Sequence, residues 1–324
     1  MNRVCISRIL TRCLLLAIVG SGAGSVEAQT NFPSKPIEII VPFGPGSNVE
    51  RLLKTTTPYL QNELGADIRI SSIPGDGGSK GLAELTKTDR GGYLLAFTPP
   101  RPLLINPKVT KTPYTLGDFI AVAQVGVFYT GLVVPAGSKW RTAQDFIDDA
   151  LKNPGAFTYA TGGELSLAHL AMEALSQVSG MKIKHSPFDN GGAAVRGVME
   201  GRADIAMTDI QAQFSKDGKT RILAIATETR LSDWPEVPTF KELGYDVVFD
   251  VWQGIVAHKG TPAEVVAKLE SAMKKVAEMP GYRQAVSSGT GATTAFLGSK
   301  DWAAKWARED KAFESVLSGL ATRK

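Results

Sequence analysis

A strand, a glycine turn and a helix start follow one another between Ile37 and Arg51, and this unit constrains the fold most strongly. The apolar run Ile37–Val41 predicts a strand, and Gly44-Pro45-Gly46 predicts the turn after it. Ser47 stands where the N-cap of the next helix is expected, and Glu50 falls in its first turn. Such a helix start directs backbone N–H groups and the positive end of the helix dipole at the turn. The turn is therefore predicted to face an anion.

The same order of strand, turn and helix recurs along the chain. Glycine-rich turns are predicted at Pro74–Gly81 and Thr161–Ser166, and each precedes a helical pattern of apolar residues. This alternation favours an α/β fold with parallel strands covered by helices. Further strands are predicted at Asp67–Ser72, Tyr93–Thr98, Phe157–Ala160, Lys182–His185, Asp204–Thr208 and Arg221–Thr227.

The chain is expected to cross twice between two such α/β lobes. Strands at Val122–Val127 and Gly131–Val134 predict the first crossing near residue 130, and Val247–Ala257 predicts the return near residue 252. Two lobes joined by a two-stranded hinge, each a mostly parallel sheet flanked by helices, would form a clamshell around a ligand cleft. We predict that residues 29–130 and 253–324 form domain 1 and that residues 131–252 form domain 2.

The first 28 residues have the pattern of a cleaved export signal. Arg3, Arg8 and Arg12 precede the apolar core Leu14–Val19, and small residues around Ala28 suit a cleavage site. Both cysteines of the chain lie in this segment, so the mature chain would have no thiol for a disulfide or a thiolate metal site. We therefore expect a periplasmic protein.

Charge and composition exclude some classes of partner. The predicted signal holds three basic residues and one acidic residue, so its removal lowers the formal charge from +4 to +2. No stripe of arginine and lysine with interleaved aromatic residues occurs, and nucleic acid is not an expected partner. With 43% hydrophobic residues the chain can form a sizeable core. We also expect the protein to act as a monomer.

Groups for catalysis are sparse in this sequence. Ser166 and His169 lie three residues apart on a predicted helix, so a hydrolase dyad is an alternative, but no orienting acid is evident. The other two histidines, His185 and His258, are scattered, and no metal site or cofactor is predicted. We therefore expect a binding protein and no enzyme.

The three glycine turns offer uncharged donors for a small anion. Each turn alone could be an ordinary connection between a strand and a helix. Three of them in an exported, two-lobed chain favour a carboxylate site. From the turns themselves the candidate ligand-binding residues are Gly44, Pro45, Gly46, Ser47, Asn48, Gly78, Ser79, Thr161, Gly162, Gly163 and Ser166.

The chain resembles the tripartite tricarboxylate transporter receptors, the Bug-type periplasmic solute-binding proteins. The likeness extends along nearly the whole mature chain. The residues that carry it include Lys35-Pro36-Ile37 through Val41-Pro42-Phe43-Gly44-Pro45-Gly46, Pro74-Gly75-Asp76-Gly77-Gly78, Gly92-Tyr93-Leu94-Leu95, Tyr159-Ala160-Thr161-Gly162, His185-Ser186-Pro187-Phe188, Gly201-Arg202-Ala203-Asp204, Trp252-Gln253-Gly254 and Gly260-Thr261-Pro262.

This resemblance implies a two-lobed periplasmic binding protein fold of the type II kind. It also implies two loops that hold the ligand as pincers, Phe43–Glu50 and Thr161–His169 in this chain. Family ligands are mostly carboxylates, held by backbone N–H groups, hydroxyls and water, and the receptor delivers them to membrane permease subunits. The expected function is therefore capture of a small organic acid for such a transporter.

The sequence departs from the family pattern within the pincers. Ser47, Glu50 and Leu165 replace a glycine, an aspartate and a glycine that the family usually has, and Asp189 stands where a basic residue is common. These changes leave the ligand open. Arg101 could pair with a second acidic group or be a solvated loop residue. Asp189 and Asp209 could instead receive an amine, and a sensor input domain is a further alternative.

Overall fold

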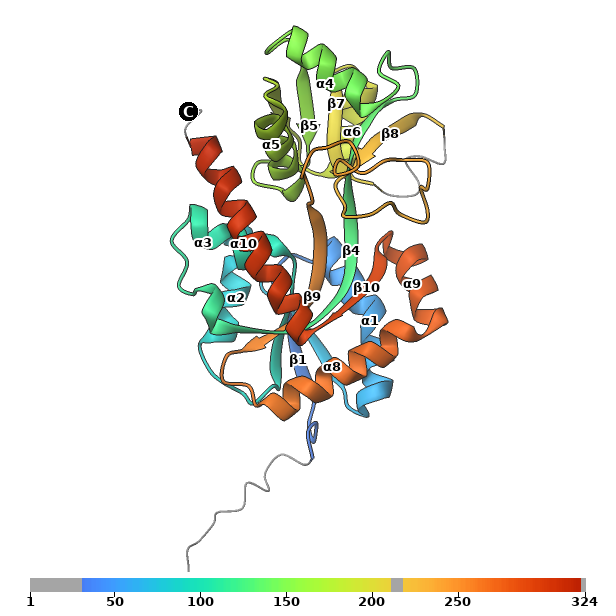
Figure 1. Cartoon of the computed structure of the whole chain (residues 1–324). Coiled ribbons are helices and arrows are strands. Elements are labelled where there is room, and N and C mark those ends of the chain that lie inside the picture. The colour runs from blue at the N-terminus through green and yellow to red at the C-terminus, as the bar shows by residue number, and fades with distance from the viewer. Residues whose placement is uncertain (1–30, 211–217, 322–324) are drawn as a thin grey trace, which may run out of the picture. The chain divides into compact units, whose positions relative to one another are not determined.

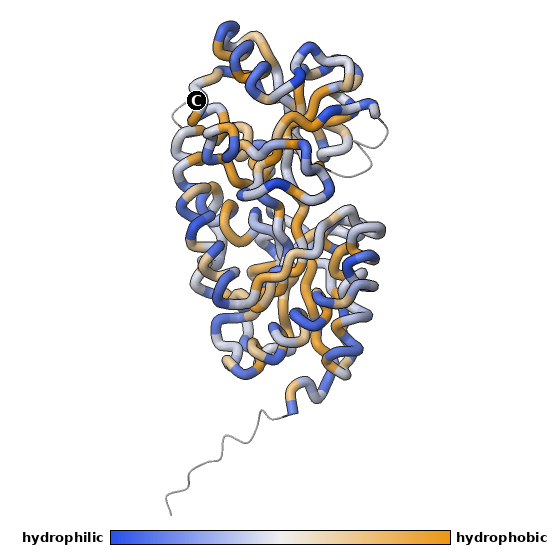
Figure 2. The backbone as a smooth tube through the Cα atoms, turned by 45° about the vertical axis from the view of Figure 1, so that its right-hand side comes forward, coloured by the Kyte–Doolittle hydropathy of each residue, from blue (hydrophilic) through white to orange (hydrophobic). Residues whose placement is uncertain are grey.

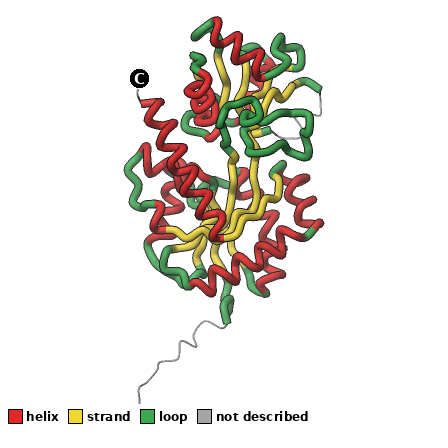
Figure 3. The backbone as a smooth tube through the Cα atoms, viewed as in Figure 1, coloured by secondary structure: helices red, strands yellow, loops and turns green. Residues whose placement is uncertain are grey.

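The computed structural model describes residues 31–210 and 218–321, so the predicted export signal lies outside the described residues. From Phe32 onward the chain forms one compact unit, with strands in the interior and helices around them (Figures 1 and 3). None of the described helices is both long and apolar enough to cross a membrane.

The described strands and helices alternate as the sequence predicts, with some boundaries shifted by a few residues. The strands are β1 (Ile37–Val41), β2 (Ile68–Ser72), β3 (Leu94–Thr98), β4 (Phe119–Pro135), β5 (Thr158–Thr161), β6 (Lys184–Pro187), β7 (Ile205–Asp209), β8 (Thr220–Ile225), β9 (Asp250–His258) and β10 (Thr293–Gly298). The helices are α1 (Asn48–Leu64), α2 (Ser79–Thr86), α3 (Asn106–Val109), α4 (Ala143–Lys152), α5 (Leu167–Ser179), α6 (Gly191–Met199), α8 (Ala263–Glu278), α9 (Pro280–Thr290) and α10 (Ser299–Ala321).

Two groups of strands share β4, and we call them the first and second lobes. The first lobe has the order β2-β1-β3-β9-β4-β10, and the second has β6-β5-β7-β4-β8. Strands β1, β2 and β3 are parallel, as are β5, β6 and β7. All pairs that involve β4 or β9 are antiparallel, because these strands carry the chain back across the sheet. The α/β fold is confirmed, but the sheets are mixed rather than mostly parallel.

Strand β4 passes through both lobes without interruption. It pairs with β9 as far as Tyr129 and then with β7 from Thr130 onward. The prediction of two separate strands here is wrong, because the β-forming residues Phe128, Tyr129 and Thr130 continue the ladder. Together β4 and β9 connect the lobes as two adjacent strands, whereas the domain boundaries given above remain a prediction.

Apolar side chains from both faces of each sheet form the core, and Figure 2 shows hydrophobic positions concentrated along the strands. In the first lobe, α1, α8 and α9 cover one face, while α2 and α10 cover the other. In the second lobe, α4 and α5 lie on one face and α6 on the other. Helix α10 contributes Trp302 and Phe313 to the core cluster that both lobes share.

Side chains cap the N-terminal ends of α1, α4, α5 and α6. The Ser47 hydroxyl accepts from Glu50 N–H at 3.2 Å, and Thr142 with Asp145 forms the capping box of α4. Helix α1 contains Pro58 in its interior and continues to Leu64. Thr261 does not cap α8, which begins after Pro262 without a side-chain cap.

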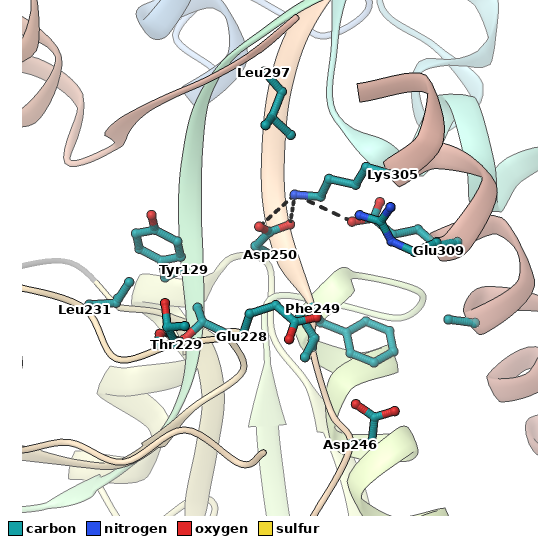
Figure 4. A pocket seen from close by; sticks show the side chains of 14 residues that line it. Tyr129, Glu228, Thr229, Leu231, Asp246, Phe249, Asp250, Leu297, Lys305 and Glu309 are labelled. Carbon is teal, nitrogen blue, oxygen red and sulfur yellow. Dashed lines mark hydrogen bonds and ion pairs between the residues drawn. The ribbon is translucent and has the colours of Figure 1, made fainter. Parts of the chain in front are cut away.

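One lysine links α10 to the hinge strand β9. Lys305 Nζ lies 2.8 Å from both carboxylate oxygens of Asp250 and 3.7 Å from Glu309 Oε1 (Figure 4). Trp252 Nε1 donates to Glu309 Oε2 at 2.6 Å. Burial and the Asp250 charge raise the pKa of Glu309 to about 8. Lys305, Asp250 and Glu309 border a cavity of about 490 Å³ beside Tyr129, where the chain passes between the lobes.

Replacing Gly254 of β9 by alanine should destabilise the protein. A Cβ at this position would overlap Ala123 O of β4 and the Trp302 indole, and backbone cannot move aside cheaply. We expect the Gly254→Ala variant to lose about 1–3 kcal/mol of unfolding free energy in urea denaturation. Gly137→Ala is the control, because a Cβ there meets nothing within 4 Å. Equal stability of the two variants would contradict this packing.

The raised Glu309 pKa predicts a specific pH dependence of stability. Between about pH 4.5 and pH 8 folded Glu309 keeps a proton that the unfolded chain releases, so its contribution to stability declines as pH rises through this window. The wild-type Tm should therefore decrease from pH 5 to pH 8.5 by at least about 2 °C more than the Tm of Glu309→Gln. Parallel pH profiles of the two proteins would disprove this assignment.

Candidate functional site

The first candidate loop joins β1 to α1. One of its backbone N–H donors is already bound by a carboxylate of the same segment. Gly46, in the left-handed region at φ 82°, donates its N–H to Glu50 Oε2 at 2.6 Å. Lys54 Nζ lies 2.9 Å from Glu50 Oε1. The hydrogen bonds from Lys54 and Gly46 lower the pKa of Glu50, which is therefore an anion at neutral pH. The Glu50 carboxylate thus accepts a hydrogen bond from a backbone N–H of the turn that precedes its own helix.

The start of α1 still offers two donors. Asn48 and Val49 occupy the first two helical positions, and their backbone N–H groups have no acceptor among the described residues. The Asn48 side chain is engaged, because its Oδ1 accepts from Arg51. Two unpaired N–H groups at the positive end of a 17-residue helix suit an anion.

The second candidate loop repeats this arrangement between β5 and α5. Ser166 Oγ accepts from His169 N–H at 3.2 Å, and His169 Nδ1 accepts from Leu165 N–H at 3.0 Å. Leu165 adopts a positive φ of 55°, a backbone conformation that costs energy for any residue other than glycine. At the start of α5, the N–H groups of Leu167 and Ala168 have no acceptor among the described residues.

Three stacked aromatic rings, one of them in the second candidate loop, hold that loop in place. The rings of His169 and His185 are parallel at 4.0 Å between centroids, and Tyr159 stacks on His185 at 4.9 Å. Burial and the neighbouring His169 lower the pKa of His185 to about 4. Neutral His185 hydrogen-bonds Thr161 Oγ1 at 2.7 Å, so it fixes the loop and adds no positive charge to it at neutral pH.

The loop before α2 completes the first-lobe side of the site. A Cβ at Gly78 would lie 3.2 Å from Phe43 Cζ and would overlap Pro102, so this glycine permits close contact between three segments. Asn106 Nδ2 donates to Gly77 O at 3.0 Å and to Ser79 Oγ at 2.8 Å. These contacts join the first candidate loop to the segment that carries Arg101.

A cavity of about 450 Å³ connects this region with the second lobe. Arg101, Ser79 and Asn106 line it from the first lobe, and Leu165 lines it from the second candidate loop. The residues Gly44–Glu50 do not line this cavity, and neither does Phe43, whose ring lies beside Gly78.

The remaining candidates lie within the second lobe. Gly162 packs against Asn190 and Gly191, since a Cβ there would lie 2.8 Å from Gly191 N. Asp189 is exposed on the adjoining loop, and Gly163 faces Phe188 O. Asp209 ends β7 opposite Thr130, and burial raises its pKa to about 6. Neither aspartate lines the cavity that contains Arg101.

The geometry assigns Ser166 and His169 to helix capping. The Ser166 hydroxyl accepts from the His169 backbone, and His169 Nδ1 is used by Leu165 N–H, so neither contact prepares a nucleophile. Among the described residues no group of three or more His, Cys, Asp or Glu side chains is placed to hold a metal ion.

Sequence reasoning missed several residues at this site. Lys80, Lys111 and Asn106 line the cavity with Arg101. Asn106 precedes Pro107, a pair that is a common turn signal, and Lys80 lies within the second glycine turn. Lys111 carries no sequence signal, because only the fold of the segment after α3 brings it to the cavity.

A family model and several known proteins are similar to this chain over most of its length. A family model for the tripartite tricarboxylate transporter family receptor matches residues 53–312. A Cupriavidus necator protein, the UPF0065 protein in the gbd 5' region, is 31% identical over 274 residues and 84% of each chain. Protein BugT of Bordetella pertussis is 30% identical over 266 residues, which cover 79% of this chain and 82% of BugT.

Solved structures agree with the fold. A TctC solute-binding protein from Polaromonas, without ligand, has a TM-score of 0.82 and 26% identity, covering 89% of this chain and all of that one. Rpa4515 of R. palustris with adipate (TM-score 0.73, 21% identity, covering 89% and 98%) and MatC from Rhodopseudomonas palustris with bound malate (0.70, 22%, 88% and 99%) share the fold. These matches confirm the two-lobed periplasmic binding protein architecture. By its match to the family model and to a relative at 31% identity, this chain belongs to the tripartite tricarboxylate transporter receptor family.

Proposed function

We propose that this protein is a periplasmic receptor that captures a small organic acid between its two lobes and delivers it to tripartite tricarboxylate-type permease subunits. One observation carries the proposal. Each lobe presents a serine-capped helix start with two backbone N–H groups that have no acceptor among the described residues, at Asn48 and Val49 and at Leu167 and Ala168. Such donors bind a carboxylate without a salt bridge.

Membership in the family supports the proposal at the level of protein class. Two proteins of similar structure carry carboxylates, adipate with Rpa4515 and malate with MatC. A ligand that contacts both helix starts would favour the arrangement in which the lobes lie close together, and the permease would recognise that arrangement. The strands β4 and β9 are the connection about which the lobes would move.

An amine-binding site has weaker support. Asp189 and Asp209 lie away from the cavity with Arg101, and Glu50 is already engaged by Gly46 and Lys54. A hydrolase also has weaker support, since Ser166 and His169 make capping contacts. The receptor is therefore proposed to act without turnover and without a cofactor.

A thermal-shift screen tests the ligand class. The chain from Gln29 onward should show a raised Tm with one class of organic acids and no response to amines of similar size. Binding adds about 2.7 kcal/mol of stability at a hundred times the dissociation constant. A response to amines and to no acid would refute the carboxylate assignment.

Removing one backbone donor tests the proposed contact. Proline at the first helical position keeps the helix and deletes the N–H, and the extended Ser47 (φ −63°, ψ 154°) accepts a following proline. Asn48→Pro should weaken binding of the acid found in the screen by about tenfold, or ~1.4 kcal/mol, measured by titration calorimetry.

The matched control is Asn48→Ala, which loses the side chain and keeps the N–H. It should bind within about twofold of wild type, and both variants should keep a similar Tm without ligand. Equal affinity of Asn48→Pro and Asn48→Ala would mean that this donor does not contact the ligand.

A further inference from the structure

Arg101 is held firmly at the edge of the cavity. It begins a turn of π-helix, Arg101–Ile105, directly after Pro99 and Pro100 at the end of β3. The three residues Leu103, Leu104 and Ile105 are essentially inaccessible to solvent and anchor this turn in the core. The backbone position of Arg101 is therefore fixed by packing and by restricted proline dihedrals.

The Arg101 side chain has no counter-charge. It is half-buried, its Nε is buried without a hydrogen-bond acceptor, and no carboxylate of the described residues lies within 4.0 Å of its guanidinium. Asp76 lines the same cavity and still forms no ion pair with it. Arg90, Arg202 and Arg230 differ in this respect, because each pairs with a glutamate.

Burial of a guanidinium without a partner costs free energy. In agreement with that environment, burial lowers the pKa of Arg101 from its ordinary value. A carboxylate in the cavity would offset this cost, and the planar guanidinium is suited to bind it through two parallel hydrogen bonds.

The cavity as a whole favours an anion. Arg101, Lys80 and Lys111 line it, against the single carboxylate of Asp76. Both lysines are exposed and form no ion pair among the described residues. Positive charge on the walls of a cleft raises the local concentration of anions and weakens in salt.

The cavity lies close to the proposed carboxylate donors of the second lobe. Leu165 forms part of its lining, two residues before the unpaired N–H of Leu167. Ser79 and Arg101 face it from the first lobe, so a ligand there would contact both lobes. Its volume of about 450 Å³ is within the range of small-molecule sites.

From this geometry we infer that the captured acid carries a second anionic group, which Arg101 binds with support from Lys80 and Lys111. The inference rests on the proposed function, and it specifies a ligand with two carboxylates or a comparable pair of acidic groups. One group contacts the backbone donors at the start of α5, which follow closely after Leu165, and the other neutralises Arg101. Arg101 is then the residue that determines specificity for diacids over monoacids.

Matched acids and an isosteric variant test this inference. Affinities are measured by calorimetry for succinate, glutarate and adipate and for butyrate, pentanoate and hexanoate. Wild type should bind the best diacid at least tenfold more tightly than the monoacid of equal length. Arg101→Met retains the packing of the side-chain stem and removes the charge, so it should lose that tenfold preference while monoacid affinity stays within about twofold.

Two further variants separate charge, geometry and structure. Arg101→Lys should recover part of the preference, because it keeps the charge and loses the bidentate contact. Lys268→Met on the exposed side of α8 removes a distant positive charge and should change neither affinity.

Each other outcome counts against the inference. If Arg101→Met weakens diacids and monoacids equally, Arg101 only supports the structure. If it changes neither, Arg101 is a solvated loop residue. If no acid of either series binds wild type, the proposed function fails, and the second anionic group is overturned with it.

Discussion

The continuous pairing of β4 is the constraint on which the rest of this structure depends. One strand of 17 residues pairs with β9 in the first lobe and with β7 and β8 in the second. Because both lobes share this strand, the loops at the ends of β1, β3 and β5 belong to one framework. Helix α10 reinforces the connection, since Gln177 of α5 donates to Val316 O and Lys305 binds Asp250 on β9.

Within that framework, each lobe uses the same local chemistry. A parallel strand ends at a glycine turn, a serine caps the next helix, and two N–H groups remain without acceptors among the described residues. The first turn has an additional internal anion in Glu50, whose charge is balanced by Lys54. Arg101 has no carboxylate partner among the described residues, and the anion-binding role inferred for its cavity rests on that observation.

Local signals made much of this fold predictable. Ser47, Thr142 and Gly180 mark helix ends at their true positions, because caps depend on residues a few places apart. The continuity of β4 was not predictable, because its partners come from distant parts of the chain. The same limit applies to the site: the stacking of His169 on His185 and the unpaired state of Arg101 depend on contacts that no local pattern encodes.

Carboxylate binding by the two helix starts is tested most directly by the backbone amide spectrum of ¹⁵N-labelled protein during titration with an acid that binds. We expect downfield proton shifts at Asn48, Val49, Leu167 and Ala168, because these N–H groups acquire a charged acceptor on binding. Saturable binding with shifts confined to other amides, and none at either helix start, would contradict that expectation.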